Sequence, residues 1–268
     1  MPLRLTLLTA GFCTAPEAAA VAGGRWRTRR FPAGIALIEG HDAGPVLFDT
    51  GYAPRIRDAT RRFPYRFYRW ATPMSVRQDE TAAAQLAARG IAPDALGHVV
   101  LSHLHADHVG GLRDFPNAAI HVLPEAVEAV RGRHGVRAVR AGILPQLLPD
   151  DLAARVHAPE RRVALPAGLA PFRDGVDLFG DGQMLGIPLP GHAPGQMGLY
   201  LEPAGGPPTL LAADAAWTLG AIRDNAPLPR LGRAVLHDAA ATRETQWRLH
   251  RLMAARPDLR VVLSHDAP

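Results

Sequence analysis

The chain has 268 residues, which is long enough to bury a substantial core in one large domain or two small ones. Its hydrophobic content of 47% and charged content of 21% are typical of a globular protein, and no apolar run reaches the ~20 residues that span a bilayer. The net charge of +5 comes from arginines scattered along the chain, which argues against a nucleic-acid partner. We therefore expect a cytoplasmic protein with one domain over residues 1–268.

The N-terminal residues predict a strand rather than a signal peptide. Residues 3–9 alternate between apolar and polar side chains, and Phe12 is too large for the small-residue pattern of a cleavage site. A loop is expected over 14–30, with a short helix at 16–20 as the alternative. The single cysteine, Cys13, excludes an internal disulfide and is expected to be a packed thiol.

Two further strands are predicted at 34–38 and 45–49, joined by a polar turn at 40–44. The second strand ends in Asp49, followed by Thr50 and Gly51. A carboxylate in this position either contributes to a site at the edge of a sheet or acts only as a turn former.

Aromatic residues and arginines are interleaved throughout residues 52–73. This composition suits a flap over a cleft, but it also suits an amphipathic segment whose arginine stems lie across the core. A homodimer interface or contact with a membrane surface would use the same chemistry.

The most informative stretch is 102–111, which contains His103, His105, Asp107 and His108 within six residues. It follows an apolar, β-branched run at 98–101 that predicts a buried strand. Imidazole and carboxylate groups are the donors that Zn²⁺ and similar ions accept, and two such groups at i and i+2 point the same way in extended chain. The spacing therefore favours two ligand groups for two adjacent metals over a histidine-rich solvated turn.

The remaining chain alternates between predicted strands and helices. Residues 132–171 carry several prolines and predict a surface excursion that contributes to a substrate pocket. Helices are expected at 79–89, 124–130 and 243–255, and strands at 118–123, 175–179, 184–189, 199–201, 209–213 and 259–263.

Four of the predicted strands end in a potential metal ligand. The ligands are His103 with His105, then His192, Asp214 and His265. Strand ends are rigid, and neighbouring strands lie ~5 Å apart, so these side chains can converge. One shared site explains all four better than four independent structural roles.

These residues resemble the metallo-β-lactamase superfamily. The stretch 102–108 matches its His-x-His-x-Asp-His motif, and the likeness extends to the Asp49 turn, the His192 loop, Asp214 and His265. The resemblance implies an α/β fold, an αββα sandwich of two mixed β-sheets packed between outer helices, with the metals at one edge.

The resemblance also implies a role for each ligand. The first metal takes His103, His105 and His192, the second takes Asp107, His108 and His265, and Asp214 bridges them. Asp49 would orient ligands by hydrogen bonding. The other seven histidines lack these contexts, and we expect them to be structural or on the surface: His41, His98, His121, His134, His157, His237 and His250.

The chain is most similar to the N-acyl-homoserine lactone lactonases of this superfamily. That branch commonly has a tyrosine three residues after the bridging aspartate, where this chain has Trp217. Only the indole Nε1–H can donate a hydrogen bond at this position. The catalytic residues expected are Asp107, as proton carrier, and Trp217, as a contact to the substrate carbonyl.

The predicted function is a hydrolase with two divalent metal ions, Zn²⁺ being the first choice. A hydroxide bridging the metals would attack the carbonyl of a small-molecule lactone or ester. The alternatives are a thioesterase resembling glyoxalase II, a phosphodiesterase, and a non-catalytic ligand sensor on the same fold.

Overall fold

The computed structural model of the protein describes residues 2–159 and 161–266. The described strands are β1 (Arg4–Pro16), β2 (Thr28–Glu39), β3 (Val46–Phe48), β4 (Met74–Ser75), β5 (His98–Val100), β6 (Ala119–His121), β7 (Val156–His157), β8 (Arg162–Ala164), β9 (Asp174–Asp177), β10 (Met184–Pro188), β11 (Met197–Leu201), β12 (Thr209–Ala213) and β13 (Arg260–Leu263).

The described helices are mostly short, and α10 is the longest of them. They are α1 (Glu17–Ala20), α2 (Ile56–Ala59), α3 (Arg66–Ala71), α4 (Ala82–Ala87), α5 (Ala106–Val109), α6 (Pro124–Val130), α7 (Gly135–Arg140), α8 (Leu152–Arg155), α9 (Leu219–Arg223) and α10 (Ala239–Ala255). No helix of the described chain combines the length and the apolar character that a membrane crossing requires.

The strands form two mixed sheets. The first has the order β4-β1-β2-β3-β5-β6-β7, and the second has the order β13-β12-β11-β10-β9-β8. In the first sheet the pairs β4–β1, β1–β2 and β2–β3 are antiparallel. The pairs β3–β5, β5–β6 and β6–β7 are parallel. The second sheet is antiparallel except for the parallel pair β12–β13.

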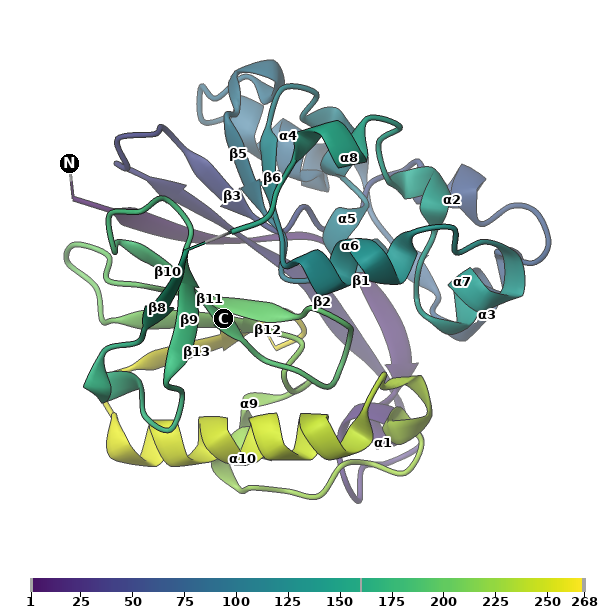
Figure 1. The fold of residues 1–268 in the computed structure, drawn as a ribbon. Coiled ribbons are helices and arrows are strands. Elements are labelled where there is room, and N and C mark those ends of the chain that lie inside the picture. The colour runs from purple at the N-terminus through teal and green to yellow at the C-terminus, as the bar shows by residue number, and fades with distance from the viewer. Residues whose placement is uncertain (1, 160, 267–268) are drawn as a thin grey trace.

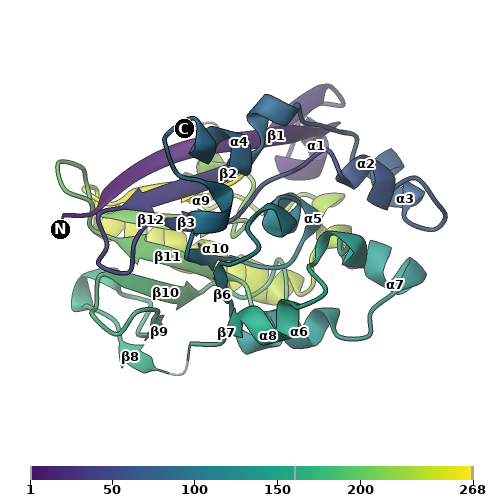
Figure 2. The ribbon, with the colours of Figure 1, turned by 90° about the horizontal axis from the view of Figure 1, so that it is seen from above.

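The two sheets face each other and carry helices on their outer faces, as Figures 1 and 2 show. An apolar layer between the sheets joins Ile38 and Phe48 of the first to Met197 and Leu199 of the second. A second cluster lies beneath the helices that cover the first sheet, and a third lies between the second sheet and α10. This four-layer arrangement confirms the αββα sandwich expected from the resemblance.

The N-terminal hairpin is longer than the sequence predicts. β1 continues from the expected 3–9 to Pro16, and β2 begins at Thr28 instead of 34. The expectation of a loop over 14–30 is therefore wrong at both ends, although α1 matches its short-helix alternative. Polar and small residues in this stretch have weak local preference for strand, so the pairing across the hairpin decides their conformation.

Two of the three predicted helices differ from expectation at their ends. α6 matches 124–130, but α10 begins at Ala239 rather than 243 because Asp238 caps it, accepting hydrogen bonds from two backbone N–H groups. The helix expected at 79–89 is a 3₁₀ turn followed by α4, which begins after the capping residue Thr81. The predicted strand 118–123 is likewise trimmed to β6, and the strand predicted at 175–179 begins one residue earlier and ends two residues earlier, as β9.

The segment 52–73 forms α2 and α3, and the excursion 132–171 forms α7, α8, β7 and β8. Figure 2 shows α3 and α7 projecting beyond the same end of the sandwich. They contact each other, since the backbone N–H of Gly135 donates to the hydroxyl of Tyr65 at 3.0 Å. These two segments together extend the molecule at the end where β3, β5 and β12 terminate.

Candidate metal centre

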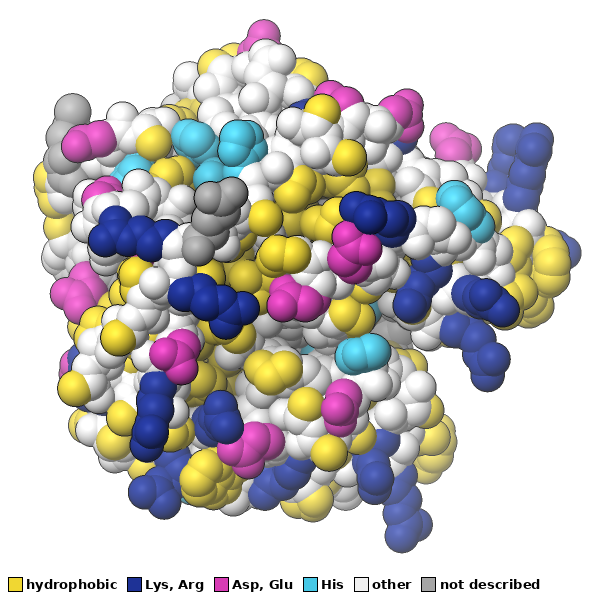
Figure 3. Space-filling view, viewed as in Figure 1, with side chains coloured by type: hydrophobic (Ala, Val, Ile, Leu, Met, Phe, Trp, Pro, Cys, Tyr) yellow, Lys and Arg dark blue, Asp and Glu magenta, His cyan; other side chains and the backbone are white. Residues whose placement is uncertain are grey.

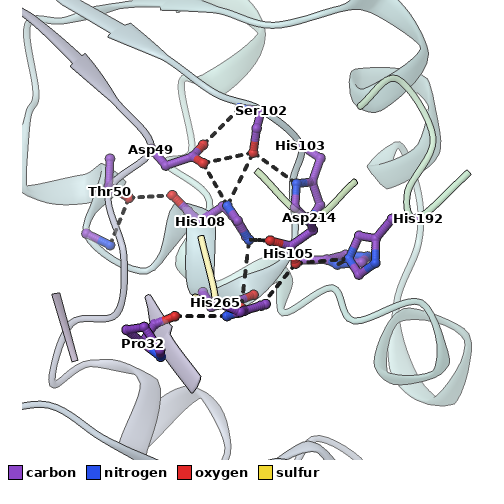
Figure 4. A network of polar contacts seen from close by, with 12 residues as sticks. Pro32, Asp49, Thr50, Ser102, His103, His105, His108, His192, Asp214 and His265 are labelled. Atoms are coloured by element: carbon purple, nitrogen blue, oxygen red, sulfur yellow. Dashed lines mark hydrogen bonds and ion pairs between the residues drawn. The ribbon is translucent and has the colours of Figure 1, made fainter. Parts of the chain in front are cut away.

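Asp49 organises the first part of the site, as Figure 4 shows. It follows β3, is fully buried, and adopts a positive φ of 57°. Its carboxylate accepts hydrogen bonds from the backbone N–H of Ser102 and from the Ser102 hydroxyl, each at 2.8 Å, and lies 2.8 Å from Nδ1 of His108. This contact directs the Nε2 atom of His108 towards the other candidate ligands.

Close backbone packing brings the turn after β3 against the end of α5. Gly51 has a φ of 63°, and a Cβ built there would lie 2.3 Å from Cβ of Ala10. A Cβ on Gly110 would lie 2.6 Å from the carbonyl oxygen of Gly51. Only glycine fits these two positions, which explains their place beside the ligand motif.

His103, His105 and His192 form one group of donors, whose ligand atoms all lie within 4.8 Å of one another. Nδ1 of His105 is 3.0 Å from Nε2 of His192, and Nδ1 of His103 is 3.0 Å from the Ser102 hydroxyl. Burial and the neighbouring imidazoles lower the pKa of His103 well below its usual range and that of His105 to about 3. These rings are therefore neutral, which is the form that binds a metal.

Asp107, His108, Asp214 and His265 form the second group, again with ligand atoms within 4.8 Å of one another. Nε2 of His265 lies 3.0 Å from Asp214 and 3.3 Å from Asp107, while its Nδ1 is 2.8 Å from the carbonyl oxygen of Pro32. Although burial opposes it, the carboxylates raise the pKa of His108 and of His265 well above the usual value. The positive charge on the imidazoles compensates the buried carboxylates.

Asp214 contacts both groups. Its Oδ2 lies 3.3 Å from Nε2 of His192 and 3.0 Å from Nε2 of His265, and its Oδ1 lies 3.5 Å from Nε2 of His108. These imidazoles outweigh the effect of burial and hold the pKa of Asp214 well below its ordinary value. The Asp214 carboxylate therefore connects the two donor groups.

The donors fit a bound metal. The Nε2 atoms of His103 and His108 are buried without a hydrogen-bond partner among the described residues, and so is Oδ1 of Asp214. Buried polar atoms are normally satisfied, so unpaired atoms that converge on one point indicate a missing ligand. Nitrogen and oxygen donors in this mixture suit Zn²⁺ and other divalent transition metals.

The structure brings all seven predicted ligands together, with contributions from both sheets. His192, Asp214 and His265 follow strands of the second sheet, whereas the other four follow β5 of the first. Sequence reasoning from neighbouring strands alone did not show that the site lies between two sheets. It also gave no role to Ser102, which links Asp49 to two histidines, or to the backbone carbonyl of Pro32.

A cavity of about 540 Å³ opens over the candidate centre. Asp107, Asp214 and His265 line it on one side, and its walls are mostly apolar, with Phe67 and Tyr68 from α3 among them. The aromatic segment 52–73 therefore forms part of a wall over the site. Cys13 also lies on this wall as a buried thiol, whose pKa burial raises to about 11.

Trp217 stands at the edge of the candidate centre. Its ring centroid lies 6.2 Å from that of His192, at an interplanar angle of 85°, and its side chain lines the same cavity. No described residue accepts a hydrogen bond from its indole N–H. The indole N–H is thus without a partner among the described residues, and the side chain borders the cavity.

Four of the other histidines gather away from the centre. His41, His98 and His121 surround the ring of Phe179 with centroid distances of 4.5, 5.2 and 5.0 Å, and His157 lies 5.9 Å from His121. They pack at the edge between the sheets, in keeping with the structural role expected for them. His237 instead lines a second cavity, of about 260 Å³, next to His105 and His192.

Comparisons with known proteins agree with this geometry. The model of the metallo-beta-lactamase superfamily matches residues 29–265. A probable metallo-hydrolase of Mycobacterium tuberculosis is 31% identical over 242 residues, covering 87% of this chain and 74% of the relative. The N-acyl homoserine lactonase AttM of Azorhizobium caulinodans is 29% identical over 231 residues, covering 84% of this chain and 79% of the relative.

A solved structure shares the fold over nearly the whole chain. It is an N-acyl homoserine lactone hydrolase with the product N-hexanoyl-L-homoserine bound at the catalytic metal centre, and it superposes with a TM-score of 0.73 at 23% identity, covering 99% of this chain and 94% of that one. The fold and the two donor groups define a metallo-hydrolase. The chain belongs to the metallo-beta-lactamase superfamily.

Proposed function

We propose that this protein is a dinuclear metal-dependent lactonase or esterase that opens a small-molecule lactone or ester with an apolar acyl chain. The observation that carries the proposal is the position of Asp214, which contacts donors of both groups at the floor of a mostly apolar cavity. The relatives named N-acyl homoserine lactonase make an N-acyl-homoserine lactone the first substrate to test.

Two divalent ions, Zn²⁺ in the first instance, would be held by the seven donors. His103, His105 and His192 would hold one, and Asp107, His108 and His265 the other, with Asp214 shared. When bound, the ions supply an activated water at neutral pH and an electrophile for the carbonyl oxygen. A bound metal would displace the proton from Nε2 of His108, while Asp49 would keep the proton on Nδ1 and hold the ring in place.

Two residues would act on the substrate directly. Asp107 reaches the cavity and would carry the proton from the attacking water to the leaving alkoxide. Trp217 would donate its free indole N–H to the carbonyl oxygen and stabilise the negative charge that develops there. The apolar walls would take up the acyl chain, with Phe67 and Tyr68 from the 52–73 segment in contact with it.

Metal analysis combined with a lactone-opening assay tests the proposal. We expect two ions per chain and release of acid from N-acyl-homoserine lactones, with both lost after chelation and in Asp214→Ala. Thioesters and a bis-aryl phosphodiester serve as the competing substrates. An active, metal-free Asp214→Ala protein would overturn the proposal, and so would turnover confined to thioesters or phosphodiesters.

A further inference from the structure

The candidate centre opens into two cavities of opposite character. The larger one, of about 540 Å³, is mostly apolar, and the smaller one, of about 260 Å³, is lined by Arg133, Arg137 and Arg140. Both include His105 and His192 in their walls, and Arg140 borders both. The two cavities are therefore two arms that meet at the candidate ligands.

The guanidinium groups of the smaller arm have no counter-charge. Its lining contains no aspartate or glutamate, and within the described chain none of the three arginines forms an ion pair or a side-chain hydrogen bond. Nearby arginines behave differently: Arg131 pairs with Glu128 at 3.0 Å, and Arg113 pairs with Asp150 at 2.7 Å. The three arginines of the arm thus keep their charge without a partner, unlike these two neighbours.

The protein fixes α7 so that these charges stay close to the centre. The backbone N–H of Ala106 donates to the carbonyl of Gly142 at 3.2 Å, and a Cβ on Gly142 would lie 2.9 Å from the ring of His105. At the other end of α7, the backbone N–H of Gly135 donates a hydrogen bond to the Tyr65 hydroxyl. Ala138, between the two helical arginines, is fully buried. Figure 3 shows arginine side chains gathered over this end of the molecule.

Three unpaired cations beside a site for divalent metals repel one another and the metals, and an anion bound in the arm would relieve this repulsion. Guanidinium groups recognise the oxygens of carboxylate and phosphate through charge-assisted hydrogen bonds. His237 adds a further polar group to the same wall.

We propose that the smaller arm is an anion-binding subsite, and that the substrate is an ester or lactone with an apolar acyl chain at one end and a carboxylate or phosphate at the other. This inference rests on the proposed hydrolase function. Water adds to the acyl carbon, the bond to the leaving oxygen breaks, and that oxygen takes the proton. From an ester, the fatty acid then remains in the apolar arm and the anionic alcohol in the arginine arm, whereas a lactone opens to a single hydroxy acid that spans both arms.

Matched esters test the subsite in the metal-loaded protein. Phenyl octanoate, 4-(octanoyloxy)benzoate and 4-(octanoyloxy)phenyl phosphate share the acyl chain and differ in the charge opposite it. We expect kcat/KM to be roughly tenfold or more higher for an anionic ester than for the neutral one, because charge-assisted hydrogen bonds form only with the anion. The carboxylate and phosphate esters show separately which anion the arm prefers.

Variants locate the effect. Arg133→Gln/Arg137→Gln should bring the anionic-to-neutral ratio down to about one, and Arg133→Lys/Arg137→Lys should retain most of it, since the charge remains. Arg131→Gln is the matched control, because Arg131 pairs with Glu128 and lies outside the lining of both arms. An unchanged ratio in the glutamine variant would show that the metals alone select the anion, and would overturn the subsite.

A binding measurement separates this inference from the proposed function. The amides 4-(octanoylamino)benzoate and N-phenyloctanamide match the esters but resist hydrolysis, and calorimetry reports their affinities for wild type and for the glutamine variant. Tighter binding of the anionic amide, lost in the variant, supports the subsite even if no ester is turned over. If the protein hydrolysed the neutral ester but bound both amides with equal affinity, the proposed hydrolase function would stand and the anion-binding subsite would be rejected.

Discussion

The substitution Asp49→Asn tests how the protein presents His108 to a metal. Asparagine has nearly the same shape and tolerates the positive φ of 57°, so the backbone is retained. One carboxylate oxygen accepts from the backbone N–H of Ser102, and the other faces the Ser102 hydroxyl and Nδ1 of His108. The amide has only one acceptor oxygen to serve both sides.

Either orientation of the amide disturbs the site. If its oxygen stays on the Ser102 N–H, its NH₂ group faces Nδ1 of His108 and favours the tautomer with the proton on Nε2, the atom needed by the metal. If the amide is reversed, its NH₂ group meets the Ser102 N–H, donor against donor. We expect metal affinity to fall by roughly ten- to a hundredfold, or about 1.4 to 2.7 kcal/mol.

Competition with a chromophoric chelator measures this loss, and circular dichroism checks that the fold is retained. Asp181→Asn is the matched control, because Asp181 lies 2.8 Å from Nε2 of His41, away from the centre. If Asp49→Asn bound both ions as tightly as the wild type, Asp49 would not set the tautomer of His108, and the reasoning would be wrong.

Three further predictions follow from the same contacts. Asp214→Asn should leave less than two ions per chain by elemental analysis, since it weakens a group that contacts both donor sets; full occupancy would refute the shared position. Trp217→Phe should lower kcat for lactones by roughly ten- to a hundredfold at unchanged metal content, and wild-type kinetics would remove the indole from the mechanism. Burial, followed by the neighbouring imidazoles, lowers the pKa of His121 from 6.5 to about 4, so the unfolded state takes up a proton below pH 6.5 while the folded ring stays neutral, and stability is lost as the pH falls from 6.5 towards 4. His121→Phe should therefore lose about 2 kcal/mol less unfolding free energy than wild type between about pH 7.5 and about pH 5; equal losses, measured by urea denaturation, would contradict it.

The sequence predicts the candidate centre better than it predicts the walls around it. Four ligands lie within six residues of the chain and the others follow recognisable strands, so local pattern and resemblance find them together. The hydroxyl of Ser102 and the carbonyl of Pro32 acquire their roles only through contacts between distant residues. In the same way, nothing local shows that Arg137 and Arg140 face the site, because the packing of Gly142 against His105 determines it.

The boundaries of elements show the same limit. α6 was predicted over its whole length because Pro124 marks its first turn. The ends of β1 and β2 were missed because a long-range antiparallel pairing, with Cys13 opposite Phe31, extends strands through residues with weak local preference. Sequence therefore predicts the boundary of an element reliably where a residue at that boundary determines it, as Pro124 does at the start of α6.

Each sheet is continuous in the chain, and this has a consequence for assembly. Residues up to His157 build the first sheet, and residues from Arg162 onwards build the second, yet each sheet holds only part of the donor set. During synthesis the His103–His108 stretch emerges long before His192, Asp214 and His265 do. The complete donor set can form only after the two halves have docked, and any bound ions would then cross-link them. Metal occupancy would thus report the last step of folding, and chelation would loosen the contact between the halves before either sheet melts.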